Sequence, residues 1–247
     1  MEPELADRCL RHCLETMGQR PLDWVLIPHH WPIETDSHYK AIQDTADYLG
    51  ARVINPEKNL GGTGGANFAI SHLNPGPEDL VLWLDGDSWP IESGWLSAMI
   101  DVMRADPKIA TLSLHPGDWP AGDPWYRPDD ERMVDGHRIW HFNHPQAFSV
   151  TLWRSTFAKP EIEAEFKWYG QIEAPTYRKS ERMGLKNAWL ADFNEKDMTP
   201  HHNPTYEAWK NAHVSRQFGG NFDEFLKALE SRQTPAEGQE RQRDRLP

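Results

Sequence analysis

The chain has 247 residues, enough for one α/β domain with a hydrophobic core, or for such a domain with a short extension. Its formal net charge of −12 at pH 7 argues against a protein that grips nucleic acid by the phosphates, because such proteins carry a basic face. The sequence contains no apolar run near the roughly 18 residues of a membrane span and no secretory signal pattern. We therefore expect a cytoplasmic protein without a membrane span.

Apolar spacing predicts alternating helices and strands through about residue 115. Helices are expected over residues 3–17, 38–50, 66–73 and 94–106. Strands are expected over residues 22–28, 51–56, 79–87 and 108–114, the third of them buried on both faces. Alternation at these intervals favours a mostly parallel sheet with helices on both sides. Cys9 and Cys13 are four positions apart on the first helix, a poor geometry for a disulfide, and we expect both as reduced core residues.

Beyond residue 115 the composition changes. Residues 115–145 are rich in Pro, Gly, Asp, His and Trp, which predicts an irregular loop region over one edge of the sheet. Further strands are expected over 146–157 and 187–193, and further helices over 174–184, 205–218 and 221–232. Residues 233–247 lack apolar anchors and predict a mobile tail.

A glycine cluster precedes the helix expected over 66–73. Its members are Gly61, Gly62, Gly64 and Gly65. A turn of this kind lets backbone N–H groups approach an anion at a helix N-terminus. The spacing matches neither the dinucleotide fingerprint nor a P-loop. The alternative interpretation is a tight connection with close helix–strand packing.

Two carboxylates, Asp85 and Asp87, end the apolar strand expected over 79–87. Ligands bind at this end of the strands in open α/β sheets. Carboxylates this close repel each other unless a cation bridges them, and Mg²⁺ or Mn²⁺ prefers oxygen ligands and pairs with phosphates. The pattern indicates a divalent metal site, with a solvated Asp-Gly-Asp turn as the alternative.

The run NLGGTGGANFAI, followed by DLVLWLDGDSWP, resembles the family-2 glycosyltransferases of the GT-A fold. The N-L-G-G-x-G-G form is most similar to the galactofuranosyl- and rhamnosyltransferase branches, and the likeness covers roughly residues 3–203. The resemblance implies an α/β GT-A fold, a Rossmann-like three-layer α/β/α domain with a mostly parallel central sheet. It implies a single domain over 1–232, with a nucleotide-sugar-binding half over 1–114, an acceptor half over 115–204 and C-terminal helices over 205–232.

The same resemblance implies a metal-dependent enzyme that moves a sugar from a nucleotide-diphosphate donor to a hydroxyl acceptor with inversion. The donor-binding candidates are Asn59, Gly61, Gly62, Gly64, Gly65, Asn67 and Asp85. Asp85 would contact the ribose or a metal-bound water. The candidate ligands for Mn²⁺ or Mg²⁺ are Asp85, Asp87 and one of His201 and His202.

The implied catalytic base is Glu173, which precedes Arg178 by five residues. The family pattern places acids four and six residues before that arginine, where this chain has Ala174 and Ile172. The match is therefore displaced by one position. Glu173 is equally explained as a carboxylate favoured at a helix N-terminus, and Asp192 is a more distant alternative base.

The acceptor side falls in the Trp-rich segment 115–145. Four aromatic residues there are candidates for stacking on a sugar, or for packing alone: Trp119, Trp125, Tyr126 and Trp140. Three histidines in the same segment, His137, His141 and His144, receive no ligand role. A glycan, a protein or a modified nucleobase all remain open as the hydroxyl acceptor.

One departure concerns the first strand, which in the family precedes the first helix. Three explanations are open: the start lies upstream, another segment takes the place of that strand in the sheet, or residues 22–28 form that strand behind an added helix.

Two other functions are alternatives to sugar transfer. One is a binding protein with an impaired site, and the other is a nucleotidyltransferase, which shares the layered architecture.

Overall fold

A computed structural model describes eight segments of the chain: residues 3–18, 25–26, 36–54, 60–85, 88–116, 128–143, 149–159 and 172–197. The chain divides into two compact units, Met1–Thr199 and Pro200–Pro247, and every described residue lies in the first. Several predictions fall outside the described residues. These concern Asn59, Asp87, Trp119, Trp125, Tyr126, His144, His201, His202, the helices over 205–218 and 221–232, and the tail over 233–247.

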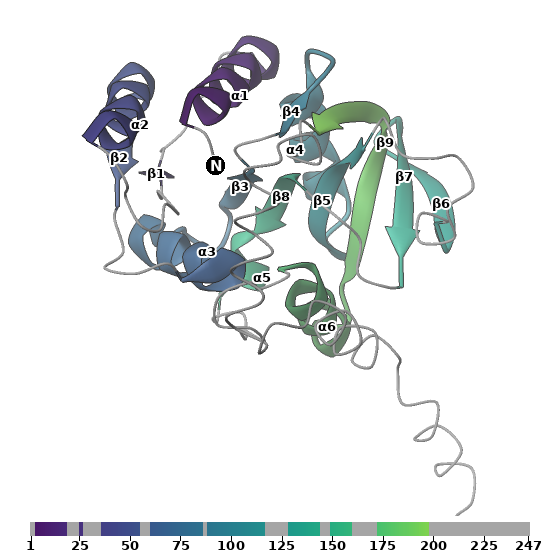
Figure 1. Ribbon diagram of the computed structural model, residues 1–247. Helices are drawn as coiled ribbons and strands as arrows, with labels where there is room; N and C mark the ends of the chain where they lie inside the picture. The colour runs from purple at the N-terminus through teal and green to yellow at the C-terminus, as the bar shows by residue number, and fades with distance from the viewer. Residues whose placement is uncertain are drawn as a thin grey trace, which may run out of the picture. The chain divides into compact units, whose positions relative to one another are not determined.

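The first part of the unit alternates helices and strands as predicted. Helix α1 (Pro3–Met17), strand β1 (Val25–Leu26), helix α2 (Asp36–Leu49) and strand β2 (Arg52–Val53) follow one another, and β1 pairs with β2 in parallel. Figure 1 shows α1 and α2 side by side. Cys9 and Cys13 are free and buried, as expected.

Helix α3 (Gly61–Leu73) begins earlier than predicted. The four glycines form its first turns instead of a separate turn ahead of it. A Cβ at Gly64 would lie 3.0 Å from the Leu60 Cβ, so the close approach of this side chain, four residues earlier, explains a glycine there. The helix ends at Asn74, which adopts the left-handed conformation with φ 46°.

The main sheet has seven strands in the order β3-β8-β5-β9-β7-β6, with β4 paired to β9 outside this path (Figure 1). The strands are β3 (Leu80–Leu84), β4 (Ser88–Pro90), β5 (Ile109–Pro116), β6 (Asp130–Val134), β7 (His137–Phe142), β8 (Val150–Arg154) and β9 (Lys186–Asp197). Among the described strands of this sheet, β5 and β9 form the one parallel pair. The prediction of a mostly parallel sheet is therefore wrong for the described strands, because β8 runs antiparallel to both β3 and β5, and β4 and β7 run antiparallel to β9.

Residues 115–145 are not wholly irregular, which corrects a second prediction. Strands β6 and β7 form a hairpin joined by Asp135 and Gly136, with φ values of 50° and 82°. Positive φ at both central positions is the mark of a type I′ turn, which Asp-Gly favours. The Asp-Gly dipeptide was therefore a usable hairpin signal in the sequence.

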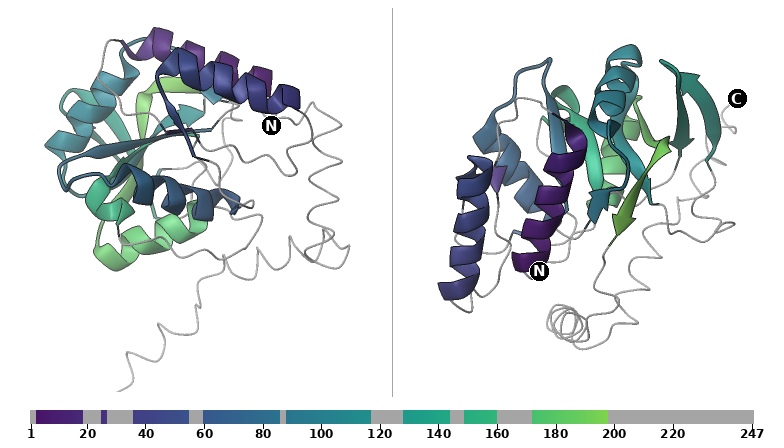
Figure 2. Two further views of the ribbon diagram at one scale, coloured as in Figure 1. Left: turned by 90° about the vertical axis from the view of Figure 1, so that its left-hand side faces the viewer. Right: turned by 90° about the horizontal axis from the view of Figure 1, so that it is seen from above.

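Helices cover both faces of the sheet, as predicted. Side chains of β3 alternate between the two layers: Leu80, Leu82 and Leu84 pack with α1 and α4 (Trp95–Ala105), and Val81 and Trp83 pack on the other face. That second face is covered by α3, α5 (Ser155–Ala158) and α6 (Glu173–Met183). The left view of Figure 2 shows the strands between the purple and dark blue helices and the group of α3 and α6.

Strand β3 lies at one side of the described sheet. The N–H of Asp85 donates to Ser149 and the C=O of Asp79 accepts from Ser155, the residues on either side of β8. By antiparallel alternation the backbone groups of Leu80, Leu82 and Leu84 therefore point away from β8. Among the described residues no strand pairs with that side, and all five β3 residues are partly exposed. Both faces of β3 pack against core clusters, as predicted, but none of its five residues is fully buried. In the described residues β1 pairs with β2 and not with β3, which does not support residues 22–28 as the first strand.

Candidate active site

The carboxyl ends of three strands meet at one edge of the sheet. Both β3 and β5 are antiparallel to β8, so they run in the same direction, and β9 is parallel to β5. The predicted metal ligand Asp85 follows directly after β3 at this edge. Ligands of open α/β sheets bind at this edge, so Asp85 stays a candidate ligand here.

The Asp85 side chain is oriented by a neighbour on its own strand. The indole Nε1–H of Trp83 donates a hydrogen bond of 2.8 Å to Oδ1 of Asp85. The backbone N–H of Asp85 donates to the C=O of Ser149 at 2.9 Å. Residues two apart share a face of a strand, so the sequence contained a signal for the Trp83 contact that we did not use.

One apolar cluster joins the three predicted motifs. On the face covered by α3 and α6, Ala66 and Ile70 of α3 pack with Trp153, Phe157 and Ile172, and Trp83 packs against them. Ala66 follows the glycines, Trp83 bonds to Asp85, and Ile172 precedes Glu173. The cluster therefore brings the glycine helix, the carboxylate strand and the acid-bearing helix together.

Two buried hydroxyls at this edge lack hydrogen-bond partners. They are Oγ1 of Thr63, among the glycines of α3, and Oγ of Ser88, which directly follows Asp87. Each side chain is 1% exposed. Buried polar groups are normally satisfied, so these two atoms leave hydrogen-bonding capacity for a polar ligand. Asn67, the remaining described donor candidate, is half-buried on α3.

Glu173 is the first residue of α6 and is half-buried. Burial raises the pKa of its carboxyl above the ordinary value, and a hydrogen bond from its own backbone opposes that shift. A carboxylate with a raised pKa is a better proton acceptor, which suits a general base. Its neighbour Ile172 anchors this end of α6 in the apolar cluster.

The alternative base, Asp192, is engaged elsewhere. Its Oδ2 accepts a hydrogen bond of 2.7 Å from the backbone N–H of Arg138, and its Oδ1 lies 3.5 Å from Nε of the same residue. These contacts hold Asp192 at the start of β7.

The described aromatic candidate for sugar stacking, Trp140, packs within the sheet. Its Nε1–H donates to Glu131 at 2.7 Å, and its ring meets His115 edge-on at 5.0 Å. The packing interpretation of Trp140 is therefore favoured.

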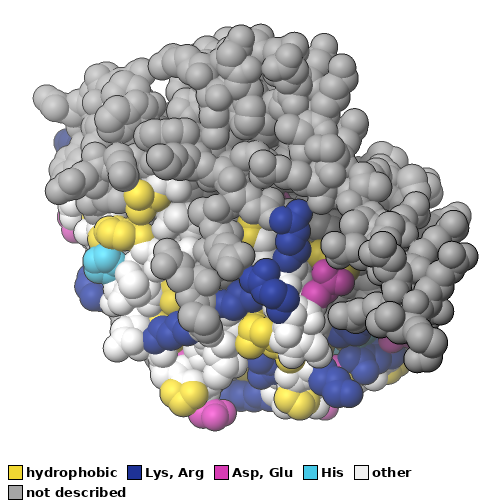
Figure 3. Space-filling model, turned by 90° about the horizontal axis from the view of Figure 1, so that it is seen from below, with side chains coloured by type: hydrophobic (Ala, Val, Ile, Leu, Met, Phe, Trp, Pro, Cys, Tyr) yellow, Lys and Arg dark blue, Asp and Glu magenta, His cyan; other side chains and the backbone are white. Residues whose placement is uncertain are grey.

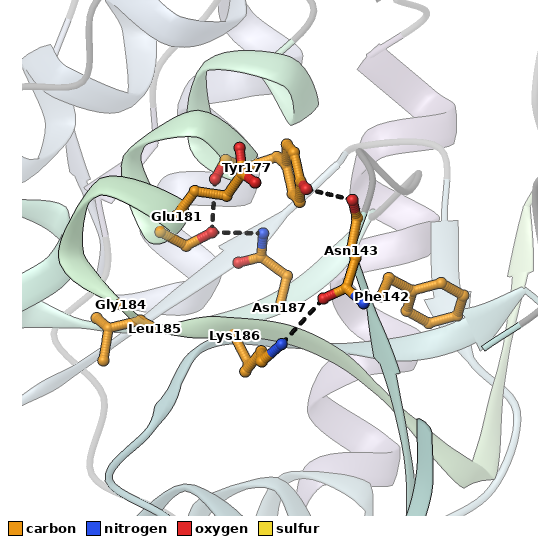
Figure 4. A pocket seen from close by; sticks show the side chains of 9 residues that line it. Phe142, Asn143, Tyr177, Glu181, Gly184, Leu185, Lys186 and Asn187 are labelled. Carbon is orange, nitrogen blue, oxygen red and sulfur yellow. Dashed lines mark hydrogen bonds between the residues drawn. The ribbon is translucent and has the colours of Figure 1, made fainter. Parts of the chain in front are cut away.

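A separate pocket of about 250 Å³ lies at the opposite end of β9, between the end of α6 and the end of β7 (Figure 4). The Nζ of Lys186 donates to Oδ1 of Asn143 at 2.9 Å, and the Nδ2 of Asn187 donates to Oγ of Ser180 at 2.9 Å. The Tyr177 hydroxyl donates to the backbone C=O of Asn143. The sequence did not predict this pocket, and its polar groups bond to one another.

Among the described charged side chains, Lys and Arg outnumber Asp and Glu in the view from below (Figure 3). Lys108, Arg182 and Lys186 are exposed at the end of the sheet where β5 and β9 begin, and the N–H of Lys186 bonds to the C=O of Lys108 at 2.8 Å. This cationic end lies opposite the edge that carries Asp85. The predicted donor site and the basic end are therefore separate features.

The family model for glycosyl transferase family 2 matches residues 5–160, and the chain belongs to this family. The fold is the α/β glycosyltransferase fold of the GT-A type, as predicted, although the described sheet is mixed. The finer prediction of a galactofuranosyl- or rhamnosyltransferase-like branch is not tested by these matches.

Solved structures share this fold at low identity. The mannosyltransferase PcManGT from Pyrobaculum calidifontis, in complex with GDP-Man and Mn²⁺, is 14% identical with a TM-score of 0.57; the match covers 92% of this chain and 61% of that chain. GalNAc-T7 with UDP, GalNAc and Mn²⁺ is 13% identical with a TM-score of 0.51, and the match covers 71% and 37% of the respective chains. The chain thus spans less than two thirds of either protein. No curated protein matches the sequence significantly.

Two further features hold for the described residues alone. None of their helices combines the length and apolar character needed to cross a membrane. They also contain no group of three or more His, Cys, Asp or Glu side chains placed to hold a metal ion. Asp87, His201 and His202 lie outside the described ranges, so Asp85 is the predicted metal ligand that the described residues include.

Proposed function

We propose that the chain is a metal-dependent glycosyltransferase that moves a sugar from a nucleoside-diphosphate donor to a hydroxyl acceptor with inversion. The observation that carries this proposal is the apolar cluster that joins the glycine helix, Trp83 beside Asp85, and the start of α6 at Glu173. Membership of glycosyl transferase family 2 supports sugar transfer as the reaction class. The solved neighbours hold nucleotide or sugar nucleotide with Mn²⁺, which supports the class of donor and the cofactor.

The residues present suit a hard divalent cation. Asp85 and Asp87 supply carboxylate oxygens, and His201 or His202 adds an imidazole nitrogen, a donor set that Mn²⁺ or Mg²⁺ accepts. When bound, the metal would stabilise the negative charge of the departing diphosphate.

The chain's own groups would act on the donor and the acceptor. Backbone N–H groups in the first turn of α3 favour an anion at the helix N-terminus, and the Thr63 and Ser88 hydroxyls offer hydrogen bonds. Glu173 would accept the proton of the acceptor hydroxyl as its oxygen attacks the anomeric carbon. The bond from that carbon to the diphosphate oxygen breaks, and the nucleoside diphosphate leaves with the electron pair. Attack from the face opposite the leaving group inverts the anomeric centre.

The test is donor turnover. We would screen GDP-, UDP- and dTDP-sugars by thermal shift with and without Mn²⁺, because a ligand that binds only the folded state raises the melting temperature. Release of free nucleoside diphosphate from the best donor would then be measured. Asp87→Ala is expected to abolish release, while Asp101→Ala, an exposed aspartate on α4, keeps it. Equal release by both variants would refute the metal site.

A binding protein with an impaired site is the second candidate. The displaced acid and the unpaired side of β3 among the described strands favour it. Saturable binding of a sugar nucleotide without turnover, with every acceptor class offered, would select this candidate over the transferase.

A further inference from the structure

A single peptide group connects the candidate metal edge to a buried carboxylate on another strand. The C=O of Ser149 accepts a hydrogen bond of 2.9 Å from the backbone N–H of Asp85. The N–H of Val150, which belongs to the same peptide unit, donates to Oε2 of Glu195 at 2.9 Å. Asp85 and Glu195 therefore hold the two ends of one peptide plane.

Glu195 reaches this peptide across the end of β5. It lies in β9, in register with Pro116 of β5 and with Pro90 of β4. Strand β5 separates β9 from β8 in the sheet, and its recorded pairing with β8 ends at Ser113 and Thr151. The Glu195 carboxylate thus serves as the acceptor that a backbone carbonyl would provide to Val150 if the ladder continued.

The Glu195 side chain is only 3% exposed. A buried carboxylate that accepts a backbone N–H makes a charge-assisted hydrogen bond, stronger than a neutral one, and linked hydrogen bonds polarise one another. Glu195 also lies near the Cys13 thiol. Burial raises the pKa of Cys13 to about 12, with further contributions from the charges of Cys9 and Glu195. Removal of the carboxylate would leave the buried N–H of Val150 without this acceptor.

We infer that Glu195 is a positioning residue, which fixes the backbone at Asp85 and so orients the Asp85 carboxylate for a divalent cation. The orienting effect rests on the proposed function, whereas the effect on the backbone does not. Glu195 is separated from the cation by Val150, Ser149 and Asp85, and acts through the peptide plane that they share.

Amide hydrogen exchange measured by NMR tests the backbone effect. In Glu195→Ala, the amides of Asp85 and Val150 are expected to exchange about tenfold faster, since each loses the support of the shared peptide. Glu195→Gln keeps a carbonyl acceptor and should retain most of the protection. The matched control is Glu92→Gln, because Glu92 also accepts from a β9 backbone N–H, that of Asn194 at 3.0 Å, while its hydrogen bonds among the described residues go to β9 and do not reach β8.

Titration with Mn²⁺ alone, followed by electron paramagnetic resonance, tests the orienting effect. The expected order of affinity is wild type and Glu92→Gln, then Glu195→Gln, then Glu195→Ala, the last weakened by about three- to tenfold. Unchanged exchange at Asp85 in Glu195→Ala would overturn the inference, as would an equal acceleration at Leu112 in the middle of β5, which would mean general loosening. Faster exchange with unchanged Mn²⁺ affinity would also overturn it. If the wild type binds no Mn²⁺, the metal-dependent function fails, and the exchange result alone decides whether Glu195 fixes this backbone.

Discussion

Trp83 and Asp85 lie on the same face of the chain as it leaves β3, and the indole N–H of the first donates to the carboxylate of the second at 2.8 Å. The Trp83 ring also stacks on Trp153, with centroids 6.0 Å apart and planes inclined by 9°. One side chain therefore both packs in the apolar layer and orients a candidate metal ligand. Trp83 thus links the packing of the core to the position of Asp85.

Trp83→Phe separates these two roles. Phenylalanine keeps an aromatic ring in the layer but cannot donate to Asp85, so we expect about 1 kcal/mol less stability together with weaker Mn²⁺ binding. Trp153→Phe is the matched control, because it changes the other ring of the same stacked pair. Chemical denaturation and Mn²⁺ titration of both variants provide the comparison. Equal loss of Mn²⁺ affinity in the two variants would mean that packing alone matters.

Glu173 predicts a specific pH dependence of activity. As a general base it must be ionised, and burial raises its pKa, so activity should fall with decreasing pH at values above the ordinary 4.5 of a glutamate. Glu173→Gln should lower the turnover rate by about 10²- to 10⁴-fold and remove this acidic limb. Glu181→Gln, at an exposed position later on α6, is the control. A pH–rate profile of Glu173→Gln that matches the wild type would exclude Glu173 as the base.

The same carboxyl predicts an opposite effect on stability. Because the folded pKa is raised, the folded state holds this proton more tightly than the unfolded state, and stability declines as pH rises from about 4.5 through the folded pKa. Glu173→Gln has no carboxyl to titrate, so its stability does not decline with pH from this cause. The variant should therefore melt above the wild type at pH 7 and close to it at pH 4, as checked by thermal unfolding at both pH values. A lower melting temperature for the variant at pH 7 would contradict the raised pKa.

The sequence predicted the elements whose signals are local. Helix α1 and the stop of α6 at Gly184, with φ 67°, follow from apolar period and glycine position. The direction of strands β8 and β7 could not be read in this way, because pairing depends on contacts distant in sequence. The start of α3 was missed because glycines have low helix propensity, whereas the helix is held by the packing of Ala66 and Ile70 in the cluster that contacts β3.

The candidate site shows the same division. Asp85 could be proposed as a site residue because two acids after an apolar strand form a local pattern. Glu195 was missed because a single glutamate in a strand carries no signal, and its role depends on a hydrogen bond to Val150, 45 residues away in sequence. The hairpin between β6 and β7 is an exception, since Asp135-Gly136 was a local signal that the Pro- and Trp-rich surroundings obscured.

The hairpin of β6 and β7 predicts a change in stability that leaves function unaffected. Gly136 has φ 82°, and a Cβ there would meet no atom within 4 Å, so only backbone strain opposes a side chain. Gly136→Ala should lower the free energy of unfolding by about 1 kcal/mol and leave donor turnover unchanged. Asp135→Asn, which suits the same turn at φ 50°, should be neutral. Urea denaturation of both variants checks the prediction. A Gly136→Ala variant as stable as the wild type would contradict a type I′ turn.

Lys179 predicts a stability effect at alkaline pH. Its side chain is 5% exposed, its Nζ lies 5.1 Å from the centroid of the Phe157 ring, and burial, with the nearby Arg182 charge, lowers its pKa to about 8. The unfolded chain binds this proton up to about pH 10.5, so between about pH 8 and 10.5 the unfolded state is the more protonated one, and stability from this group rises with pH. Lys179→Met removes the buried charge and should melt above the wild type at pH 7, with the difference shrinking from pH 8 to 10. Lys186→Met, at an exposed position, should show no such convergence. Melting curves that stay parallel across this range would mean that Lys179 keeps an ordinary pKa in the folded protein.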